Sequence, residues 1–112
     1  MASNKLKIGA HCVPCEGGIP PFTTSEAKTF LVYTPHWKLK NKRLERAFIF
    51  KDFKQSLAFV NRVGKIAERE GHHPDIVIHW NKVELSIWTH AISGLSENDF
   101  ILARKIDQVP LK

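Results

Sequence analysis

The amino-acid sequence predicts an α+β fold, a four-stranded antiparallel sheet with helices packed on one face. Three helix-start signals are separated by two stretches in which apolar and polar residues alternate, so the expected order is helix, hairpin, helix, hairpin, helix. With 112 residues, the chain has the usual size of one domain and can bury a core without disulfides or metal. We therefore expect an N-terminal tail or loop at residues 1–22 and a single α+β domain at residues 23–112.

The N-terminal stretch is rich in residues that interrupt helices and strands. Residues 9–22 contain three Gly and three Pro, which predicts a loop that leads into the domain. Cys12 and Cys15 have the spacing of a zinc or redox pair. A structural zinc site needs four ligands, however, and the sequence has no second pair of this kind. We therefore expect a reduced segment that holds no metal.

The first helix and the first hairpin follow this loop. Thr23, with Glu26 three residues later, forms a capping-box pattern, and Pro35 ends the helix. One face of this helix is apolar and consists of Ala27, Phe30 and Leu31. Residues 37–51 are expected to form two strands around a polar turn at residues 40–42, because side chains in the second half alternate as in a half-buried strand.

The longest helix is expected to begin at Asp52 and to end at Gly71. Gln55 occupies the capping-box position at its start. Its predicted buried stripe consists of Phe53, Leu57, Val60, Val63 and Ala67. Glycine is the usual residue just past a helix end, and Pro74 prevents continuation while it holds the residue before it extended. The two histidines between Gly71 and Pro74 are therefore expected on a constrained corner.

The second hairpin is expected to bring two histidines together at its open end. Residues 76–80 and 83–90 alternate as two strands joined by a two-residue turn at residues 81–82. Antiparallel pairing then fixes which residues face each other across the hairpin. The expected pairs are Trp80 with Val83, Asp75 with Trp88, and His73 with His90.

A last helix closes the predicted domain. Ser96 is its expected N-cap, and Asp99 occupies the third helical position. The helix should end before Pro110. Its expected inward-facing residues are Phe100, Ala103, Ile106 and Val109.

The charge of the chain leaves a nucleic-acid binder as one alternative. Lys and Arg outnumber Asp and Glu by 17 to 11, which gives a net charge of +6. The basic residues are scattered, apart from one short cluster at residues 38–46, so attraction to an anionic substrate or an ordinary solvated surface explains them equally well. No apolar run has the length of a membrane helix, and the N-terminus lacks an apolar signal core. We expect a cytoplasmic protein that binds neither membrane nor nucleic acid.

The histidine cluster is the candidate for chemistry. His72 precedes His73 on the corner, His90 is expected opposite them, and Asp99 begins a helix nearby. Several imidazoles around one pocket suit proton transfer or metal binding. The ordinary alternative is that the histidines are solvated loop residues and Asp99 is the partner of a helix cap. Because three imidazoles converge beside an abrupt corner, we expect a site.

Four motifs together resemble the signature of one enzyme family. They are Glu68-Arg-Glu-Gly-His-His-Pro74, then Trp80, then Thr89-His90 and finally Leu95-Ser-Glu-Asn-Asp99. Their spacing is similar to that of the pterin-4a-carbinolamine dehydratases, and the resemblance extends over about residues 12–110 because the stretch from Cys12 looks like bacterial-type members. Asn98 and Ile76 stand where animal members usually have Arg and Trp, so the details of substrate binding are expected to differ.

The resemblance implies dehydration of a 4a-hydroxytetrahydropterin to the quinonoid dihydropterin and water, without a metal or an organic cofactor. This step recycles the cofactor of aromatic amino acid hydroxylases. By resemblance, His72 and His90 are the acid/base residues, and His73 completes the catalytic set mainly by binding and orienting the pterin. The residues expected to shape or contact the substrate pocket are Glu68, Pro74, Trp80, Thr89 and Asp99.

The resemblance also implies the partners of the chain. Besides the pterin substrate, these are further copies of the chain in a homodimer or homotetramer, and a functional link to an aromatic amino acid hydroxylase. Vertebrate members also bind a homeodomain transcription factor through a helical surface. A non-enzymatic interaction module of the transcriptional-coactivator kind is therefore the alternative function.

Overall fold

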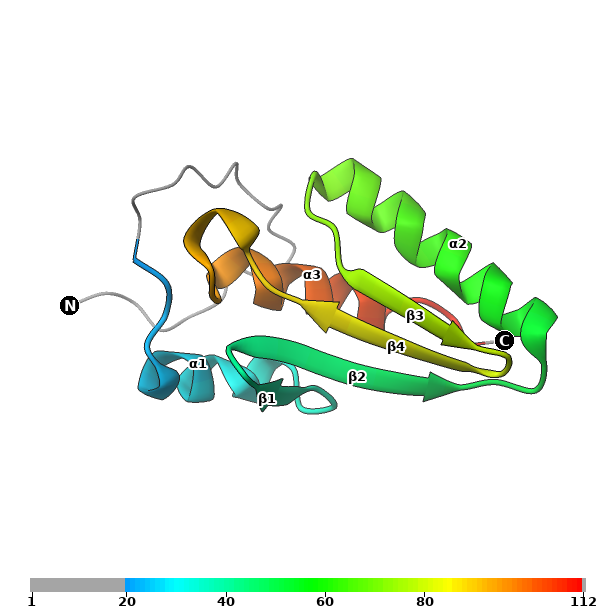
Figure 1. Ribbon diagram of the computed structural model, residues 1–112, viewed down its shortest axis with the longest axis horizontal. Coiled ribbons are helices and arrows are strands. Elements are labelled where there is room, and N and C mark those ends of the chain that lie inside the picture. Colours follow the sequence, from blue (N-terminus) through cyan, green and yellow to red (C-terminus); the bar gives the residue numbers. More distant parts are fainter. Residues whose placement is uncertain (1–19, 112) are drawn as a thin grey trace.

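The computed structural model describes residues 20–111, so the prediction for Cys12 and Cys15 lies outside the described residues. Within this range the chain forms four strands, three α-helices and two short 3-10 helices (Figure 1). The elements in order are α1 (Thr24–Phe30), η1 (Leu31–Tyr33), β1 (Lys38–Lys40), β2 (Arg43–Ile49), α2 (Phe53–Glu70), β3 (Asp75–His79), β4 (Lys82–Ile87), η2 (His90–Ile92) and α3 (Glu97–Asp107).

The four strands form one antiparallel sheet in the order β1-β2-β4-β3, which confirms the predicted α+β fold. One face of the sheet is buried, because alternate residues of the central strands point toward the helices. In β4 these are Val83, Leu85 and Ile87, each at most 1% exposed. The opposite face carries mainly polar and charged residues and is not covered by a helix of residues 20–111 (Figure 1).

The segment before α1 is held against the loop that precedes α3. Thr23 and Glu26 form the predicted capping box at the start of α1. The Phe22 backbone N–H donates to the Leu95 carbonyl at 2.8 Å, and the Phe22 ring stacks on Phe30 with ring centroids 4.9 Å apart. A Cβ atom at Gly94 would come within 2.6 Å of Pro21, so only glycine fits there. This contact binds the chain leading into α1 to the η2–α3 loop.

The buried face of α2 differs from the predicted stripe. Val63 and Ala67 are buried as expected, but Phe53 and Leu57 are 44% and 39% exposed. The residues that α2 buries are Ser56, Phe59, Val63, Ile66, Ala67 and Glu70. The observed buried stripe is therefore rotated around the helix relative to the predicted one. It includes the polar residues Ser56 and Glu70, which a pattern of apolar residues alone does not indicate. Glu70 is paired with the Lys105 ammonium of α3 at 3.2 Å.

The predicted register of the β3–β4 hairpin is wrong by two residues. The observed turn is Trp80-Asn81, so His79 pairs with Lys82, and Asp75 pairs with Ser86 rather than with Trp88. Trp80 has a φ of 45°, a left-handed backbone that a bulky residue rarely adopts, so residue preferences alone do not indicate this turn. The turn is held by Asn81, whose carbonyl accepts from the Phe50 N–H at 2.7 Å.

The predicted strand through His90 is also shorter in the structure. Strand β4 ends at Ile87, and His90 begins the 3-10 helix η2. Thr89 and Gly94 close this short loop through a backbone N–H to carbonyl bond of 2.8 Å. No helix among the described residues 20–111 has the length and hydrophobicity needed to cross a membrane.

Candidate active site

The corner after α2 presents two adjacent histidines. Gly71 caps α2 with a φ of 64°, a left-handed conformation that glycine adopts at little cost. The His72 N–H then donates back to the Ala67 carbonyl at 3.2 Å, and Pro74 leads into β3. The predicted constrained corner is confirmed. It fixes the backbone of His72 and His73 at the end of the sheet where β4 leaves it.

His72 is held by a buried carboxylate. Its Nε2 atom lies 2.6 Å from Asp99 Oδ1, and the two side chains are 13% and 0% exposed. A carboxylate can only accept, so the Nε2–H of His72 donates to Asp99. The other ring nitrogen, Nδ1, is therefore the atom of His72 that remains for a proton exchange with a ligand.

Asp99 is itself fixed by two further donors. The Thr89 hydroxyl and the Ser96 backbone N–H both donate to Asp99 Oδ2 at 2.8 Å. Because Thr89 gives its only hydroxyl hydrogen to Asp99, the Ser96 hydroxyl donates to Thr89 Oγ1 at 2.9 Å. A buried carboxylate needs such donors to offset the loss of water. Asp99 therefore serves both as the helix-cap partner and as the support of His72.

His90 is held by stacking. Its imidazole lies against the Trp88 ring, with ring centroids 4.0 Å apart and planes 25° apart. The Trp88 Nε1–H donates to Asp75 Oδ2 at 3.2 Å, and the Arg43 guanidinium lies over the same indole at 4.6 Å from the centroid. Trp88 is thus fixed by contacts with strands β3 and β2, and its indole in turn holds the His90 ring in place.

His73 is more open to solvent than His72. Its Nε2 atom bonds to Glu68 Oε2, which reaches forward from the last turns of α2. The two side chains are 59% and 79% exposed, so this pair contributes little to the free energy of folding. It can nevertheless fix the direction of the His73 ring.

These histidines line one pocket of about 280 Å³. The lining residues are Gly71, His72, His73, Trp88, Thr89, His90, Ala91 and Asn98. The structure therefore brings together four of the predicted site residues, while Asp99 and Glu68 support two of them from behind. Residues 20–111 contain no cluster of three His, Cys, Asp or Glu side chains with the geometry of a metal site.

Two predicted site residues lie apart from the pocket, and others were missed. Pro74 shapes the corner but does not line the pocket, and Trp80 lies on the hairpin turn at the opposite end of β3, 62% exposed. Trp88 lines the pocket, although the sequence predicted it only as the strand partner of Asp75. Asn98 was noted only as a departure from the family pattern, although this residue is 5% exposed and lines the pocket.

The arrangement suits proton transfer to and from a small planar ligand. An imidazole held through one nitrogen by a carboxylate offers the other nitrogen in a fixed direction. A second imidazole, His90, faces the same pocket from another element, so two groups can exchange protons with one ligand. The Trp88 indole beside them adds an aromatic surface.

Known proteins of one family are similar to this chain over most of its length. The family model described as "Pterin 4 alpha carbinolamine dehydratase" matches residues 20–109. A Methylococcus capsulatus protein named "Putative pterin-4-alpha-carbinolamine dehydratase" is 49% identical over 101 residues, covering 88% of this chain and 89% of that protein.

Solved structures agree as well. The crystal structure of a transcriptional coactivator/pterin dehydratase from Brucella melitensis matches with a TM-score of 0.72 and 30% identity, over 78% of this chain and 95% of that chain. A pterin dehydratase-like protein identified as a RuBisCO assembly factor in the alpha-carboxysome matches with a TM-score of 0.52 and 25% identity, over 63% of this chain and 82% of that chain. The chain therefore belongs to the pterin 4 alpha carbinolamine dehydratase family, a family of lyases.

Proposed function

We propose that the chain dehydrates a 4a-hydroxytetrahydropterin to the quinonoid dihydropterin and water by histidine acid/base catalysis. The observation that carries the proposal is the pair of imidazoles, His72 and His90, that face one pocket while a buried carboxylate fixes the first of them. Family membership supplies the substrate class. The geometry supplies groups that can move the two protons of this reaction.

In the proposed reaction the bond between C4a and the hydroxyl oxygen breaks. The leaving oxygen takes a proton from an imidazolium and departs as water, while N5 loses its proton to a neutral imidazole and its electron pair forms the C4a=N5 double bond. The two histidines thus exchange protonation states, and one proton transfer between them or through solvent restores the site. General acid or base help of this kind contributes about 10²-fold to 10⁴-fold each.

The surrounding residues have supporting roles in this proposal. Asp99 and Thr89 keep His72 in one tautomer, since a carboxylate at Nε2 requires the proton there. His73, oriented by Glu68, binds and orients the pterin at the solvent side of the pocket. Pro74 keeps the histidine corner extended, and a substrate contact by Trp80 is not part of the proposal.

The test is the rate of breakdown of a chemically generated 4a-carbinolamine, followed by stopped-flow absorbance. The chain should exceed the buffer rate, and His72→Ala and His90→Ala should each lower kcat by about 10²-fold or more. His79→Ala is a matched control, because His79 lies at the far end of β3, outside the pocket. A rate equal to that of buffer, or full activity in both variants, would contradict the proposal.

The biological setting follows from the same chemistry. A quinonoid dihydropterin is the form from which a reductase regenerates a tetrahydropterin, so the chain would act in tetrahydropterin recycling beside an aromatic amino acid hydroxylase in the cytoplasm. We also propose a homodimer or homotetramer. Sedimentation or light scattering of the purified chain measures that state directly.

An interaction role is the second candidate. Phe53 and Leu57 leave 44% and 39% of their surface exposed on one side of α2, and the Brucella melitensis relative is described as a transcriptional coactivator as well as a dehydratase. Leu57→Glu should then abolish capture of a partner protein while it leaves the dehydratase rate unchanged. Lack of any stable partner for the unaltered chain would count against this role.

A further inference from the structure

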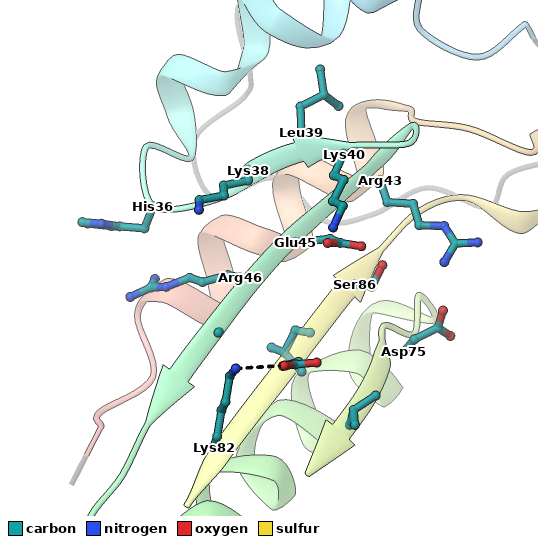
Figure 2. Close-up of a pocket in the computed structure, with 14 residues that line it drawn as sticks. His36, Lys38, Leu39, Lys40, Arg43, Glu45, Arg46, Asp75, Lys82 and Ser86 are labelled. Carbon is teal, nitrogen blue, oxygen red and sulfur yellow. Dashed lines mark ion pairs between the residues drawn. The ribbon is translucent and has the colours of Figure 1, made fainter. Parts of the chain in front are cut away.

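We infer that the pterin pocket continues onto the uncovered face of the sheet, and that Arg43 and Lys40 there bind an anionic group on the C6 substituent of the substrate. This inference rests on the proposed function, because it names the class of pterin that the site would take. It concerns the hollow of about 990 Å³ on the side of the sheet away from the helices (Figure 2).

The histidine pocket is too small for a pterin with a long substituent. Its volume of about 280 Å³ lies at the lower limit of small-molecule sites, which measure about 300–1,000 Å³. The reacting atoms C4a and N5 must lie at the histidines, and C6 is bonded to N5. A C6 substituent therefore projects from the pterin ring at a point close to His90 and to the Trp88 indole stacked on it.

Strand register places two cations beyond Trp88. Leu44 pairs with Ile87, so one step further Arg43 lies opposite Trp88, in agreement with their contact at 4.6 Å. Lys40 pairs with Arg43 across the β1–β2 turn. Adjacent strands are about 4.8 Å apart, so a substituent that follows this row meets the indole, then the guanidinium, then the ammonium.

These two cations are available for a ligand. Within residues 20–111 neither Lys40 nor Arg43 has an ion-pair partner, although Arg43 rests on the Trp88 ring. Figure 2 shows both side chains near the β1–β2 turn, on the same side of the sheet as Ser86, with the Lys40 ammonium toward Glu45 and the Arg43 guanidinium directed away from it. A guanidinium that stacks through its face keeps its N–H groups free for the bidentate binding of phosphate or carboxylate.

Other charges on this face are more nearly balanced. In the next row Lys38 pairs in register with Glu45, and Asp75 accepts from Trp88. Further along, the Lys82 ammonium lies 3.1 Å from Glu84 and holds the pKa of that carboxyl below its ordinary value. The row of Lys40 and Arg43 is therefore the one that contains no carboxylate of its own, which favours an anion at that place rather than over the whole face.

The experiment compares two pterins that differ only in charge. Binding of 6-hydroxymethylpterin and of its diphosphate ester to the full chain is measured from the fluorescence of the pterin at low ionic strength. The ester should bind about tenfold more tightly, as expected for two exposed charge pairs and their hydrogen bonds. Higher salt should remove most of this advantage, because exposed charges are screened.

Matched variants locate the effect. Lys40→Gln should reduce the advantage of the ester about threefold while the neutral pterin binds as before. Arg43→Gln should reduce the same ratio of affinities about threefold, and Arg43→Lys should restore part of it. Lys40→Gln alters an exposed residue that does not touch Trp88, so it remains informative if loss of Arg43 disturbs the indole. Lys54→Gln, an equal change of charge at an exposed position of α2 outside both hollows, should have little effect.

Several results would overturn the inference. Equal affinity for both pterins would reject the inference and leave the proposed function standing. The same holds if Lys54→Gln reduces the advantage of the ester as much as Lys40→Gln does, because this would show only attraction by the net charge of +6. Inorganic pyrophosphate that binds as tightly as the ester would show a phosphate site unrelated to pterins. If neither pterin binds, the proposed function fails, and the inference fails with it.

Discussion

Asp99 holds His72 across 27 residues of sequence, through a contact of 2.6 Å between Asp99 Oδ1 and His72 Nε2. The carboxylate lies at the start of α3 and the imidazole lies just after α2. The contact therefore joins the two long helices at the end of the sheet, and it makes the protonation pattern of His72 depend on how these helices pack.

Replacement of Asp99 by asparagine should lower both the catalytic rate and the stability of the fold. The amide keeps the shape, but it can present only one acceptor oxygen to the three donors that the carboxylate satisfies. We expect kcat to fall about 10-fold to 100-fold, as for other residues that orient a reactive imidazole. The free energy of unfolding should fall by about 1–3 kcal/mol. Stopped-flow kinetics and urea denaturation measure the two effects.

A neighbouring variant serves as the control for Asp99. Glu97→Gln removes a charge from the same turn of α3 at a partly exposed residue that does not contact His72. It should change the free energy of unfolding by less than about 0.5 kcal/mol. If both variants lose the same stability and activity, the buried contact with His72 has no special role.

The two tryptophans near the hairpin should differ in their effect on catalysis. Trp88→Ala removes the surface on which His90 rests, and we expect kcat/KM to fall about tenfold or more, because small displacements of a catalytic group are costly. Trp88→Phe keeps an aromatic ring but loses the bond to Asp75, so kcat/KM should fall less than in Trp88→Ala. Trp80→Ala, at the exposed hairpin turn, should retain the original kcat/KM.

The kinetic pattern of Trp88→Ala distinguishes positioning from simple unfolding. A misplaced His90 should lower kcat and alter the pH dependence of the rate, while thermal denaturation shows a folded protein. Activity in Trp80→Ala that falls as far as in Trp88→Ala would show instead that the turn residue contacts the substrate.

The observed face of α2 can be verified by stability measurements. Phe59 is 1% exposed, so Phe59→Ala should lower the free energy of unfolding by about 3–5 kcal/mol. Leu57 is 39% exposed, and Leu57→Ala should lower it by less than about 1 kcal/mol. Chemical denaturation at equilibrium gives both values. A larger loss of stability in Leu57→Ala than in Phe59→Ala would instead support the buried stripe predicted from the sequence.

Two glycines, one within α2 and one at its C-terminal end, should respond in opposite ways to alanine. Gly71 has a φ of 64°, so Gly71→Ala should cost about 1 kcal/mol although the site has room for a methyl group. Activity should also fall, since the histidine corner follows directly. A methyl group at Gly64 would meet no atom within 4 Å, so Gly64→Ala should raise stability by about 0.5–1 kcal/mol. Gly71→Asn should lose less than Gly71→Ala, and urea denaturation compares the three variants.

The sequence predicted the elements well because local signals define them. The start of α1 follows from Thr23 and Glu26, and the end of α2 follows from Gly71, since each acts through backbone hydrogen bonds within a few residues. The corner that carries His72 and His73 was predictable for the same reason. These are interactions whose partners are close in sequence.

The hairpin register was not predictable from the same kind of signal. A slip of one residue would turn the apolar side chains away from the core, but a slip of two keeps them facing inward, so alternation cannot separate the two registers. Trp80 in a left-handed turn is chosen by contacts of Asn81 with Phe50, which is distant in sequence. The stacking of Trp88 on His90 was missed because the strand was expected to continue through His90, whereas β4 ends at Ile87 and His90 begins η2.

The contact between Gly94 and Pro21 determines which fragment of the chain can serve for experiments. A shortened version that starts at Thr23 would lack both Pro21 and the Phe22 ring stacked on Phe30. The loop between η2 and α3, which leads from His90 to Asp99, would then lose its outer support. Expression clones and crystallisation trials should therefore retain Pro21 and Phe22, even where a shorter boundary looks attractive.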